Sequence, residues 1–516
     1  MSDSSLEPKS RRNTRKLHKN PRSVKSMTIV LAAVGIVAFL FRLIPLLTSG
    51  TLGGFRGYDD GVHYASGVNL LAGLLPYRDF VLVHPPGIAL LMVPFAFIGQ
   101  LFSDTAGIGA ARVFFAMIGA LNAVLIGVLL RRWGYVAVLA GAFLYSVSPV
   151  ATIAERSIML SPLLTVCTLA AMLSSSRNGT EPSKGKIGLA AVFLALAMCF
   201  KLWAIVPIAV VVAMVGLRYG PRILARFLLV GTLVCCVVMG PFFIAAPVAM
   251  FNNVIVAQLV RTDGAVKDLV YRLNDFVGVP LPQTMLFAVA IGGVVVVLAA
   301  AAIGLRYSFR PVKWADEFWW AVLASATVAT LLIAMSFFDH YPNFSAAYLA
   351  LCLGATLGFF VQKLALGRVP IVRGVVLALV AVCLVPVGIR GFILEPKPLP
   401  NVNEAELAAE TAPFSCVFTP YAYLGIISDS LSRSVDHGCG SVVDVYGTRM
   451  VEGLESAAFS PISSGELQIE QLRVSDAAVV GNPQEYYGMS PAAIDELTKN
   501  FVLEATQGNF QVWVRR

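Results

Sequence analysis

Charged residues are scarce in this sequence. Only 13% of its 516 residues are Asp, Glu, Lys or Arg, whereas 57% are apolar. Soluble domains carry roughly 25% charged and about 45–50% apolar residues, so the composition excludes a soluble globular protein and a disordered chain. At about 20 apolar residues per crossing, the chain has room for roughly a dozen transmembrane helices.

Several common functional signatures are also missing. The eight cysteines and five histidines do not have the spacing of a zinc site. The C-terminal part has neither a Gly-rich phosphate loop nor a nucleophile elbow, and no internal repeat is visible anywhere in the chain. The function therefore has to be sought in the placement of polar residues within a membrane protein.

The formal charge of +9 is distributed in a way that argues against a nucleic-acid partner. Residues 1–26 hold eight Lys/Arg against two acids, whereas residues 391–516 hold seven Lys/Arg against sixteen acids. The remaining basic residues lie in loops between apolar runs. Basic tails and loops of this kind report membrane topology, because Lys and Arg accumulate on the cytoplasmic side.

The basic tail, residues 1–26, precedes an apolar run over residues 27–47. A cleavable signal peptide would have a shorter apolar core, about 7–15 residues, and a small-residue cleavage site. We therefore predict an uncleaved first helix with a cytoplasmic N-terminus, followed by a first outer loop over residues 48–106.

The apolar stretch 88–102 decides the topology that follows. It is interrupted by Pro94 and Gly99, and it is short for a hydrocarbon layer about 30 Å thick. If this stretch crossed the membrane, Arg131 and Arg132 would lie outside. If it lies along the outer surface, all later basic loops fall on the cytoplasmic side, as the charge bias requires. We predict a juxtamembrane helix.

This choice predicts an all-α polytopic membrane protein of about eleven transmembrane helices with an extracytoplasmic C-terminus. The least certain span is 187–217, where Lys201 and Pro207 interrupt the apolar run; a hairpin there keeps the charge pattern. The expected helices are 27–47, 107–130, 134–153, 159–176, 187–202, 203–217, 227–246, 283–305, 315–337, 345–361 and 372–390.

The composition changes after Arg390, at a Pro-rich linker. We expect three parts: the basic tail 1–26, a transmembrane domain 27–390 and a small outer α/β domain 391–516. In the last part, short β-rich runs alternate with helical patterns. The expected strands are Cys416–Thr419, Ser441–Tyr446, Ala477–Val480 and Phe510–Val514, and the expected helices are Glu404–Glu410 and Pro491–Lys499.

Cysteine use fits this layout. Six cysteines lie within expected spans, where thiols act as small apolar groups. Cys416 and Cys439 lie in the outer domain, an oxidising compartment in this topology, and we predict a disulfide between them rather than two free thiols.

Polar residues that are unusual next to a membrane gather on the predicted outer face. Such residues are functional candidates because charge at membrane depth is costly. Simple alternatives exist: the Asp59-Asp60 turn as a helix cap, Glu155-Arg156 as a local ion pair, and Lys201 reaching the interface without a ligand. The set comprises Tyr58, Asp59, Asp60, His63, Tyr64, Arg78, Asp79 and His84 in the first outer loop, Glu155 and Arg156 in the second, Lys201 after the fifth span, and Asp339, His340 and Tyr341 between the ninth and tenth.

A carboxylate near a membrane surface, with Lys, Arg and His nearby, suits group transfer from a phosphorylated lipid to a hydroxyl. The carboxylate accepts the proton of the hydroxyl, and the cations stabilise charge on the departing phosphate. A transporter or lipid flippase would place polar residues on broken helices near the bilayer midplane within paired repeats. A receptor or assembly protein without catalysis is the third alternative.

These residues resemble a known family. The order is one helix, an acid pair followed by Tyr64-Ala65, a His84-Pro-Pro-Gly motif at a juxtamembrane helix, a helix led by Ala111-Arg112, and a late His-Tyr. This pattern resembles the polytopic C-type glycosyltransferases, such as protein O-mannosyltransferases and bacterial aminoarabinose transferases. It is most similar to actinobacterial members that build mannose- or arabinose-containing envelope glycans. The resemblance covers about residues 27–390.

The resemblance implies an inverting transferase in the plasma membrane that takes a sugar from a polyprenyl-monophosphate donor. The acceptor is then a hydroxyl of an envelope glycan or glycolipid on the outer face. Asp59 would be the general base, and Asp60 would support it or help bind Mg²⁺ or Mn²⁺. The residues expected to contact substrate or phosphate are His84, Tyr64, Arg78, Glu155, Arg156, Lys201, His340 and Tyr341.

One departure from the family pattern affects the metal. The family often has an acid before the proline that follows the second outer loop, and this chain has Ser161-Pro162 there. Either Glu155 replaces that acid, or the chain lacks the acid altogether. The sequence therefore leaves open whether a divalent cation binds. For the outer domain, acceptor-glycan binding and a purely structural cap are both compatible with its acidic charge.

Overall fold

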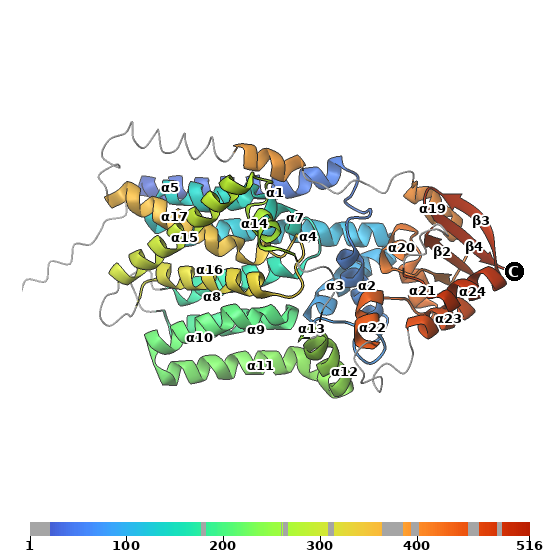
Figure 1. Ribbon diagram of the computed structural model, residues 1–516. Helices are drawn as coiled ribbons and strands as arrows, with labels where there is room; N and C mark the ends of the chain where they lie inside the picture. Colours follow the sequence, from blue (N-terminus) through green and yellow to red (C-terminus); the bar gives the residue numbers. More distant parts are fainter. Residues whose placement is uncertain are drawn as a thin grey trace, which may run out of the picture.

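The structure is a computed structural model that describes residues 21–176, 182–259, 261, 267–307, 314–363, 385–393, 402–452, 464–481 and 488–516. Long helices lie side by side along one axis, and a small domain of helices and strands covers one end of this bundle (Figure 1). We call this end the domain end and the other the opposite end.

Among the described residues, seven helices are long and apolar enough to cross a membrane, or eight if one bent pair counts as a single span. The predicted class, a helical polytopic membrane protein with a small C-terminal α/β domain, is confirmed. The long helices are α1 (Pro21–Thr48), α4 (Asp104–Leu130), α10 (Ile205–Tyr219, preceded by η3, Leu202–Ala204), α11 (Pro221–Ala245), α15 (Gln283–Arg306), α16 (Asp316–Ile333) and α17 (Asn343–Lys363).

Three expected spans differ from this description. The span 134–153 is a bent series in which Pro149 starts a new helix, because a proline lacks the N–H that would continue the preceding turn. The spans 159–176 and 187–202 are the shorter helices α8 (Leu160–Ser175) and α9 (Lys184–Phe200). The bent series comprises η1 (Arg131–Trp133), α5 (Tyr135–Val138), η2 (Leu139–Phe143), α6 (Leu144–Val147) and α7 (Pro149–Glu155). Most of the eleventh span, 372–390, lies outside the described residues, of which 385–393 are helical.

The predicted hairpin between residues 187 and 217 is present. The backbone becomes extended at Lys201, which ends α9 and precedes η3. Lys201 contacts Tyr341, which precedes α17, whereas Arg218 near the end of α10 pairs with Asp316 at the start of α16. The two residues therefore lie at different ends of the bundle.

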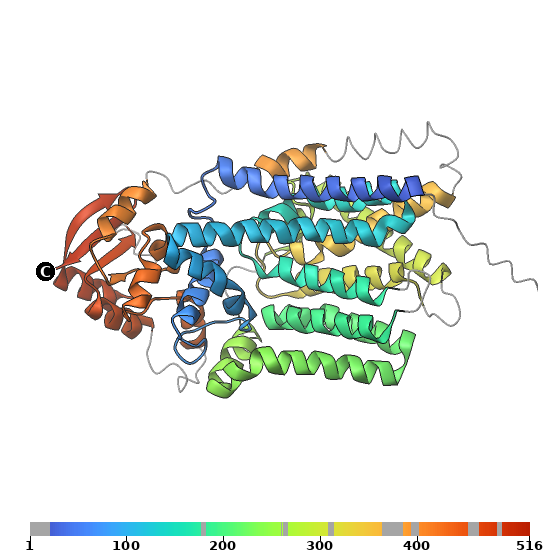
Figure 2. The same cartoon turned by 180° about the vertical axis from the view of Figure 1, so that it is seen from behind.

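The chain between α1 and α4 stays at the domain end. It contains α2 (Tyr58–Leu71) and α3 (Gly87–Leu101), which lie between the bundle and the C-terminal domain (Figures 1 and 2). Gln100 at the end of α3 donates to Asp436 of that domain at 2.8 Å, and Ser432 of the domain donates to Asp104 at the start of α4. Because α4 begins at the end where α1 finishes, α3 does not traverse the bundle.

Two short helical segments complete the membrane-facing part. One comprises α12 (Pro247–Phe251), η4 (Asn252–Val256) and α13 (Ala257–Leu259), and the other is α14 (Leu269–Val277). Arg272 of α14 donates to the carbonyl oxygens of Leu331 and Leu332, at the end of α16. These contacts place α14 against the domain end of α16.

The C-terminal domain is built on a four-stranded sheet in the order β1-β2-β4-β3, in which β1 and β2 are parallel and the other pairs antiparallel. The strands are β1 (Val417–Phe418), β2 (Ala477–Gly481), β3 (Phe501–Gln507) and β4 (Phe510–Arg515). The helices are α19 (Glu404–Thr411), α20 (Ala422–Ile427), α21 (Leu431–Asp436), α22 (Val445–Glu452), α23 (Ser464–Val474) and α24 (Pro491–Asn500).

The prediction of a strand at Ser441–Tyr446 is wrong. Residues 441–444 are irregular, and α22 begins at Val445, because the Asp444 carboxylate accepts the Gly447 N–H and caps this helix. Val442 and Val443 are buried in two different apolar clusters, which explains their strand-like pattern. Strand β3 was not predicted.

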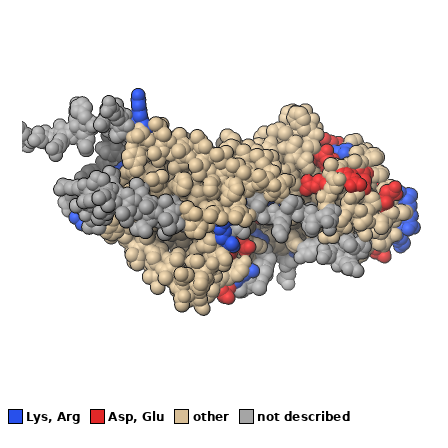
Figure 3. Space-filling model, turned by 90° about the horizontal axis from the view of Figure 1, so that it is seen from above, with Lys and Arg blue, Asp and Glu red and all other residues tan. Residues whose placement is uncertain are grey.

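The outside of the bundle is apolar. Val237 and Ile244 of α11 are 74% and 82% exposed, and Ile291 of α15 is 65% exposed. On the face in Figure 3, acidic and basic side chains gather over the C-terminal domain and are sparse over the bundle. Such a surface requires lipid around it, so the chain is a multi-pass membrane protein.

Candidate active site

The candidate site begins at the first turn of α2. Gly57 precedes the helix in extended conformation, and Asp59 and Asp60 lie in its first turn, where carboxylates favour the positive end of the helix dipole. Neighbouring helix residues point in directions about 100° apart, so the two carboxylates face different surroundings. Gly61 allows the C-terminal domain to approach, since a Cβ there would lie 2.9 Å from the Tyr423 backbone nitrogen.

Asp60 faces the bundle and is fully engaged. It is 1% exposed, forms an ion pair with Arg112 of α4 at 2.8 Å, and accepts the Ile158 N–H at 2.9 Å. The Ala-Arg motif at Ala111-Arg112 thus supplies the partner of the second acid. Asp60 therefore anchors α2 to the bundle, which is a positioning role.

The residues present do not fit the divalent cation left open by the sequence. The Asp60 oxygens are taken by Arg112 and Ile158, and no group of three His, Cys, Asp or Glu among the described residues could hold a metal ion.

Asp59 is half-buried and faces basic residues instead. Burial lowers the pKa of Lys201 to about 8, and the charge of Asp59 opposes this shift. Burial also lowers the pKa of His340 to about 4, again opposed by Asp59. Because each of these groups feels the Asp59 carboxylate, the structure brings together residues that are about 140 and 280 positions away from Asp59 in the sequence.

His63, His84 and Arg261 complete a group that we call the basic cluster: His63, His84, Lys201, Arg261 and His340. The His63 and His84 rings lie 5.8 Å apart, and His63 Nδ1 is 2.6 Å from the Ile158 carbonyl oxygen. Burial holds the pKa of His84 well below its usual range, and the charges of the other four members act in the same direction. Of these five residues only His63 is fully buried; the other four are partly exposed, and Lys201 and Arg261 carry the positive charge.

Aromatic side chains border the basic cluster on the bundle side. Lys201 Nζ lies 4.2 Å from the Trp203 ring centroid and 4.9 Å from that of Tyr341. The Arg261 guanidinium lies 5.1 Å from the Phe338 ring. The His340 and Tyr341 rings are 4.9 Å apart. Cations held against aromatic faces at the end of a membrane bundle suit a ligand with a charged head and an apolar tail.

Four other residues expected at the site have different surroundings. Glu155 is paired with Arg42 rather than with Arg156, and it accepts hydrogen bonds from Asn122 and Tyr145. Arg156 donates to the carbonyl oxygens of Phe41 and Gly391. Both residues are completely buried and join helices of the bundle. The alternative of a local Glu155–Arg156 pair is wrong, because Arg42 occupies the carboxylate.

Tyr64 and Arg78 also lie away from the basic cluster. Tyr64 is buried on the other face of α2 and donates to Asp104 at 3.3 Å. Arg78 is exposed and forms an ion pair with Asp79 at 2.8 Å. In the C-terminal domain, Cys416 and Cys439, the two cysteines expected to pair, are joined by a disulfide that links β1 to the segment after α21.

Three functional candidates escaped the sequence reasoning or its list of site residues. His63 follows Asp59 by four positions and so shares its helix face, a signal that could have identified it. Arg261 lies between two expected spans, 227–246 and 283–305, and no pattern in the sequence singled it out. Asp444 accepts a hydrogen bond from Tyr58 at 2.7 Å across 386 positions, and no local pattern indicates this contact.

Asp444 adjoins the site from the C-terminal domain. Burial raises the pKa of its carboxyl group, the Gly447 N–H and the Tyr58 hydroxyl lower it, and the charge of Asp59 raises it further. Tyr446 N donates to the Tyr58 oxygen at 3.1 Å. The C-terminal domain thus holds the residue immediately before Asp59.

The arrangement combines one half-buried carboxylate, that of Asp59, with the cations of Lys201 and Arg261 at the end of a helical membrane bundle. It can accept a proton at Asp59 and stabilise an anion at Lys201 and Arg261. An arrangement of this kind suits transfer from a phosphorylated carrier at a membrane surface.

Comparison with known proteins extends this description to particular relatives in fold. No protein-family model matches the chain, and no curated protein matches it in sequence. Among solved structures, it is similar to ArnT from Cupriavidus metallidurans in the apo state, with a TM-score of 0.57 and 16% identity over 95% of this chain and 98% of that chain. ArnT bound to undecaprenyl phosphate gives a TM-score of 0.53 and 16% identity over 95% and 97%.

A third similar structure is that of the archaeal oligosaccharyltransferase AglB from Archaeoglobus fulgidus, in complex with an inhibitory peptide and a dolichol-phosphate. Its TM-score is 0.51 and its identity 13%, over 96% of this chain and 75% of that chain. At these identities the likeness concerns the fold. The C-type glycosyltransferase fold expected from the sequence resemblance is therefore confirmed.

Proposed function

We propose that this protein is a glycosyltransferase that moves a sugar, mannose or arabinose, from a polyprenyl-monophosphate donor to a hydroxyl of an envelope glycan or glycolipid. The observation that carries the proposal is the position of Asp59, beside Lys201 and His340 at the domain end of the bundle. The fold supports it, since ArnT and AglB share this fold and were solved with undecaprenyl phosphate and dolichol-phosphate.

The chemistry follows from charge. Asp59 takes the proton of the acceptor hydroxyl, and the hydroxyl oxygen forms a bond to the anomeric carbon. The bond between that carbon and the phosphate oxygen breaks with its electron pair, so the phosphate leaves with an additional negative charge. Attack from the face opposite the leaving group inverts the configuration of the anomeric carbon. Lys201 and Arg261 stabilise the departing phosphate.

The neutral histidines have a different part. Because burial lowers the pKa of His84 and brings that of His340 to about 4, both imidazoles are uncharged near pH 7. A neutral imidazole donates one hydrogen bond without adding a buried charge. His84 and His340 therefore orient the phosphate oxygens, while Lys201 and Arg261 carry the charge. Trp203 and Tyr341 border the lipid chain.

The compartment follows from the same proposal. At the opposite end, Arg132 follows α4 and Arg218 lies in the last turn of α10. By the positive-inside bias, both residues face the cytoplasm. The domain end, with Asp59 and the disulfide between Cys416 and Cys439, then faces the outside of the plasma membrane. Donor lipid, acceptor and base meet there.

Replacing Asp59 with Asn tests the proposal. Loss of a general base lowers rates by about 10²–10⁴-fold, so we expect D59N to lose transfer while still binding undecaprenyl phosphate. The assay measures consumption of polyprenyl-phosphate mannose and polyprenyl-phosphate arabinose by the full chain in vesicles that contain envelope extract. D495N is the matched control, because Asp495 is an exposed acid on α24. Transfer by D59N at the rate of the unchanged protein would refute the role of Asp59.

A further inference from the structure

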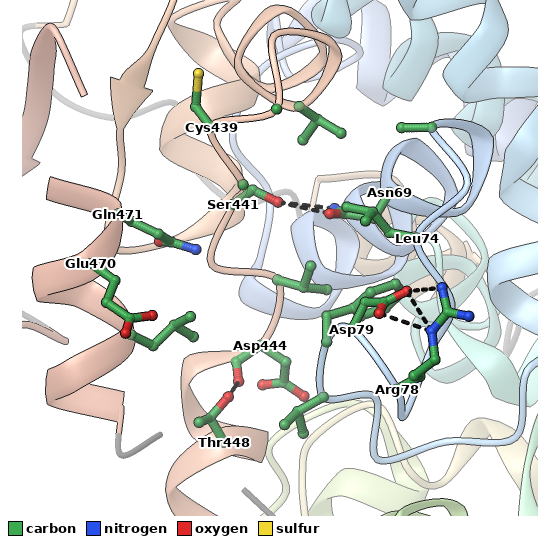
Figure 4. A pocket seen from close by; sticks show the side chains of 18 of the residues that line it. Asn69, Leu74, Arg78, Asp79, Cys439, Ser441, Asp444, Thr448, Glu470 and Gln471 are labelled. Carbon is green, nitrogen blue, oxygen red and sulfur yellow. Dashed lines mark hydrogen bonds and ion pairs between the residues drawn. The ribbon is translucent and has the colours of Figure 1, made fainter. Parts of the chain in front are cut away.

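A pocket of about 800 Å³ lies between the first outer loop and the C-terminal domain. Its volume falls within the range of about 300–1,000 Å³ that is usual for small-molecule sites. The residues from Asn69 to Val81 form one wall, and α21, α23 and the segment before α22 form the other. In Figure 4, Glu470 and Gln471 of α23 face the loop that carries Arg78 and Asp79.

Gln471 presents its side-chain amide to the pocket. Its exposed fraction is only 9%, and it lines the pocket (Figure 4). In the described part of the chain its side-chain amide has no hydrogen-bond partner; only its backbone carbonyl is used, by Ser475. Its amide atoms are not among the fully buried polar atoms that lack a partner, so they are open to water or to a ligand in the pocket. The amide can donate two hydrogen bonds and accept two, as alternating hydroxyl groups require.

The pocket has the opposite charge to the basic cluster. Four carboxylates line it, from Asp79, Asp436, Asp444 and Glu470, against the single cation of Arg78. Arg78 is neutralised by its ion pair with Asp79. The remaining acids repel a phosphate and accept hydrogen bonds from hydroxyl groups. The pocket therefore favours a polyhydroxylated ligand without negative charge.

Two contacts connect the pocket to the candidate active site. Asp444 lines the pocket and accepts a hydrogen bond from Tyr58, the residue before Asp59, at 2.7 Å. Tyr77 lines the pocket and donates to the carbonyl oxygen of His84, a member of the basic cluster, at 2.6 Å. Asp59 and His84 are not among the described residues that line the pocket, so these contacts connect its walls to the candidate active site through Tyr58 and through the backbone of His84.

We propose that this pocket binds the acceptor as an uncharged glycan, with Gln471 and Glu470 hydrogen-bonded to its hydroxyl groups. The proposal rests on the proposed glycosyltransferase function and adds the chemical class of the acceptor. It also assigns the C-terminal domain a part in substrate selection. An anionic, phosphorylated acceptor is excluded from this pocket by its charge.

Ligand binding by the full chain in detergent tests the proposal. The probes are tetrasaccharides of mannose, arabinose and glucose, together with mannotetraose 6-phosphate, measured by saturation-transfer NMR. We expect at least one uncharged tetrasaccharide to bind about tenfold more tightly than the phosphorylated one. Gln471→Leu and Glu470→Gln should each weaken this binding about five- to tenfold, since each removes one or two hydrogen bonds. Glu466→Gln is the matched control, an exposed glutamate of α23 outside the pocket.

The outcomes separate this inference from the function on which it rests. Undecaprenyl phosphate binding is measured on the same variants. If it binds and transfer proceeds, but no uncharged tetrasaccharide binds, the acceptor proposal is overturned and the glycosyltransferase function stands. Tighter binding of mannotetraose 6-phosphate, or equal binding by Q471L, E470Q and E466Q, also overturns it. If undecaprenyl phosphate does not bind to the unchanged protein, the proposed function itself fails.

Discussion

The two ends of the helical bundle hold buried charges in different ways. At the opposite end, Arg132 pairs with Glu317, and Arg218 pairs with Asp316 at 2.7 Å. Ser176 adds a hydrogen bond to Asp316, and the Trp133 indole adds one to Glu317. At the domain end, by contrast, Lys201 and the histidines of the basic cluster lie near one another, and the carboxylates near them are those of half-buried Asp59, exposed Asp339 and buried Asp444.

We infer that the buried charges at the two ends have different roles. A buried charge is costly to desolvate, and a partner within the protein compensates part of that cost; removing the partner leaves an uncompensated buried charge. Titratable groups with perturbed pKa values that gather in one place are typical of functional sites rather than of structural ion pairs. We therefore interpret the paired charges of the opposite end as a structural network, and we propose that the domain end binds an anion.

The largest expected effect comes from replacing Arg218 at the opposite end and Lys201 at the domain end, each with methionine. Arg218→Met leaves the nearly buried Asp316 with a weaker partner at 3.6 Å, so we expect a loss of about 3 kcal/mol in the free energy of unfolding. Lys201→Met should leave stability unchanged and weaken undecaprenyl phosphate binding by about ten- to a hundredfold, the value of a charge-assisted hydrogen bond. Thermal denaturation and lipid titration in detergent measure the two effects.

The distinction between a structural end and a binding end would be wrong if the two variants behaved alike. Equal destabilisation by Lys201→Met would make Lys201 a structural residue, and unchanged lipid binding would remove it from the site. Lys201→Arg is the control that keeps the charge.

A smaller effect concerns pH. The pKa of Lys201 is lowered to about 8 in the folded protein, so its ammonium group is present below pH 8 and is lost as the pH rises through that value. A phosphate monoester is already fully ionised there, since its second pKa is about 6. Undecaprenyl phosphate affinity should therefore decrease about tenfold per pH unit above 8. A flat profile between pH 7 and pH 10, or the same slope in Lys201→Met, would contradict this assignment.

Much of the fold could be predicted because the bilayer imposes length and composition on each helix. The apolar runs located the seven long helices, and the basic loops identified the break at Lys201. The error at Ser441–Tyr446 arose because Val442 and Val443 pack into two clusters around a capping Asp444, and this packing imitates the alternation of a strand.

The site was harder to predict than the fold. Polarity next to a membrane pointed to Asp59, His84, Lys201 and His340, and the structure brings these residues together. The same criterion selected Glu155, whose partner Arg42 lies 113 positions away. Sequence polarity alone does not reveal whether a buried charge already has a partner, because partners come from distant helices.

The most direct test of the account is a structure of the full chain in a nanodisc that contains undecaprenyl phosphate. We predict that the phosphate group lies at the domain end in contact with Lys201 and Arg261, and that the lipid chain lies along Trp203 and Tyr341. A phosphate bound beside Arg132 and Arg218 at the opposite end, or within the acidic pocket lined by Gln471, would contradict it.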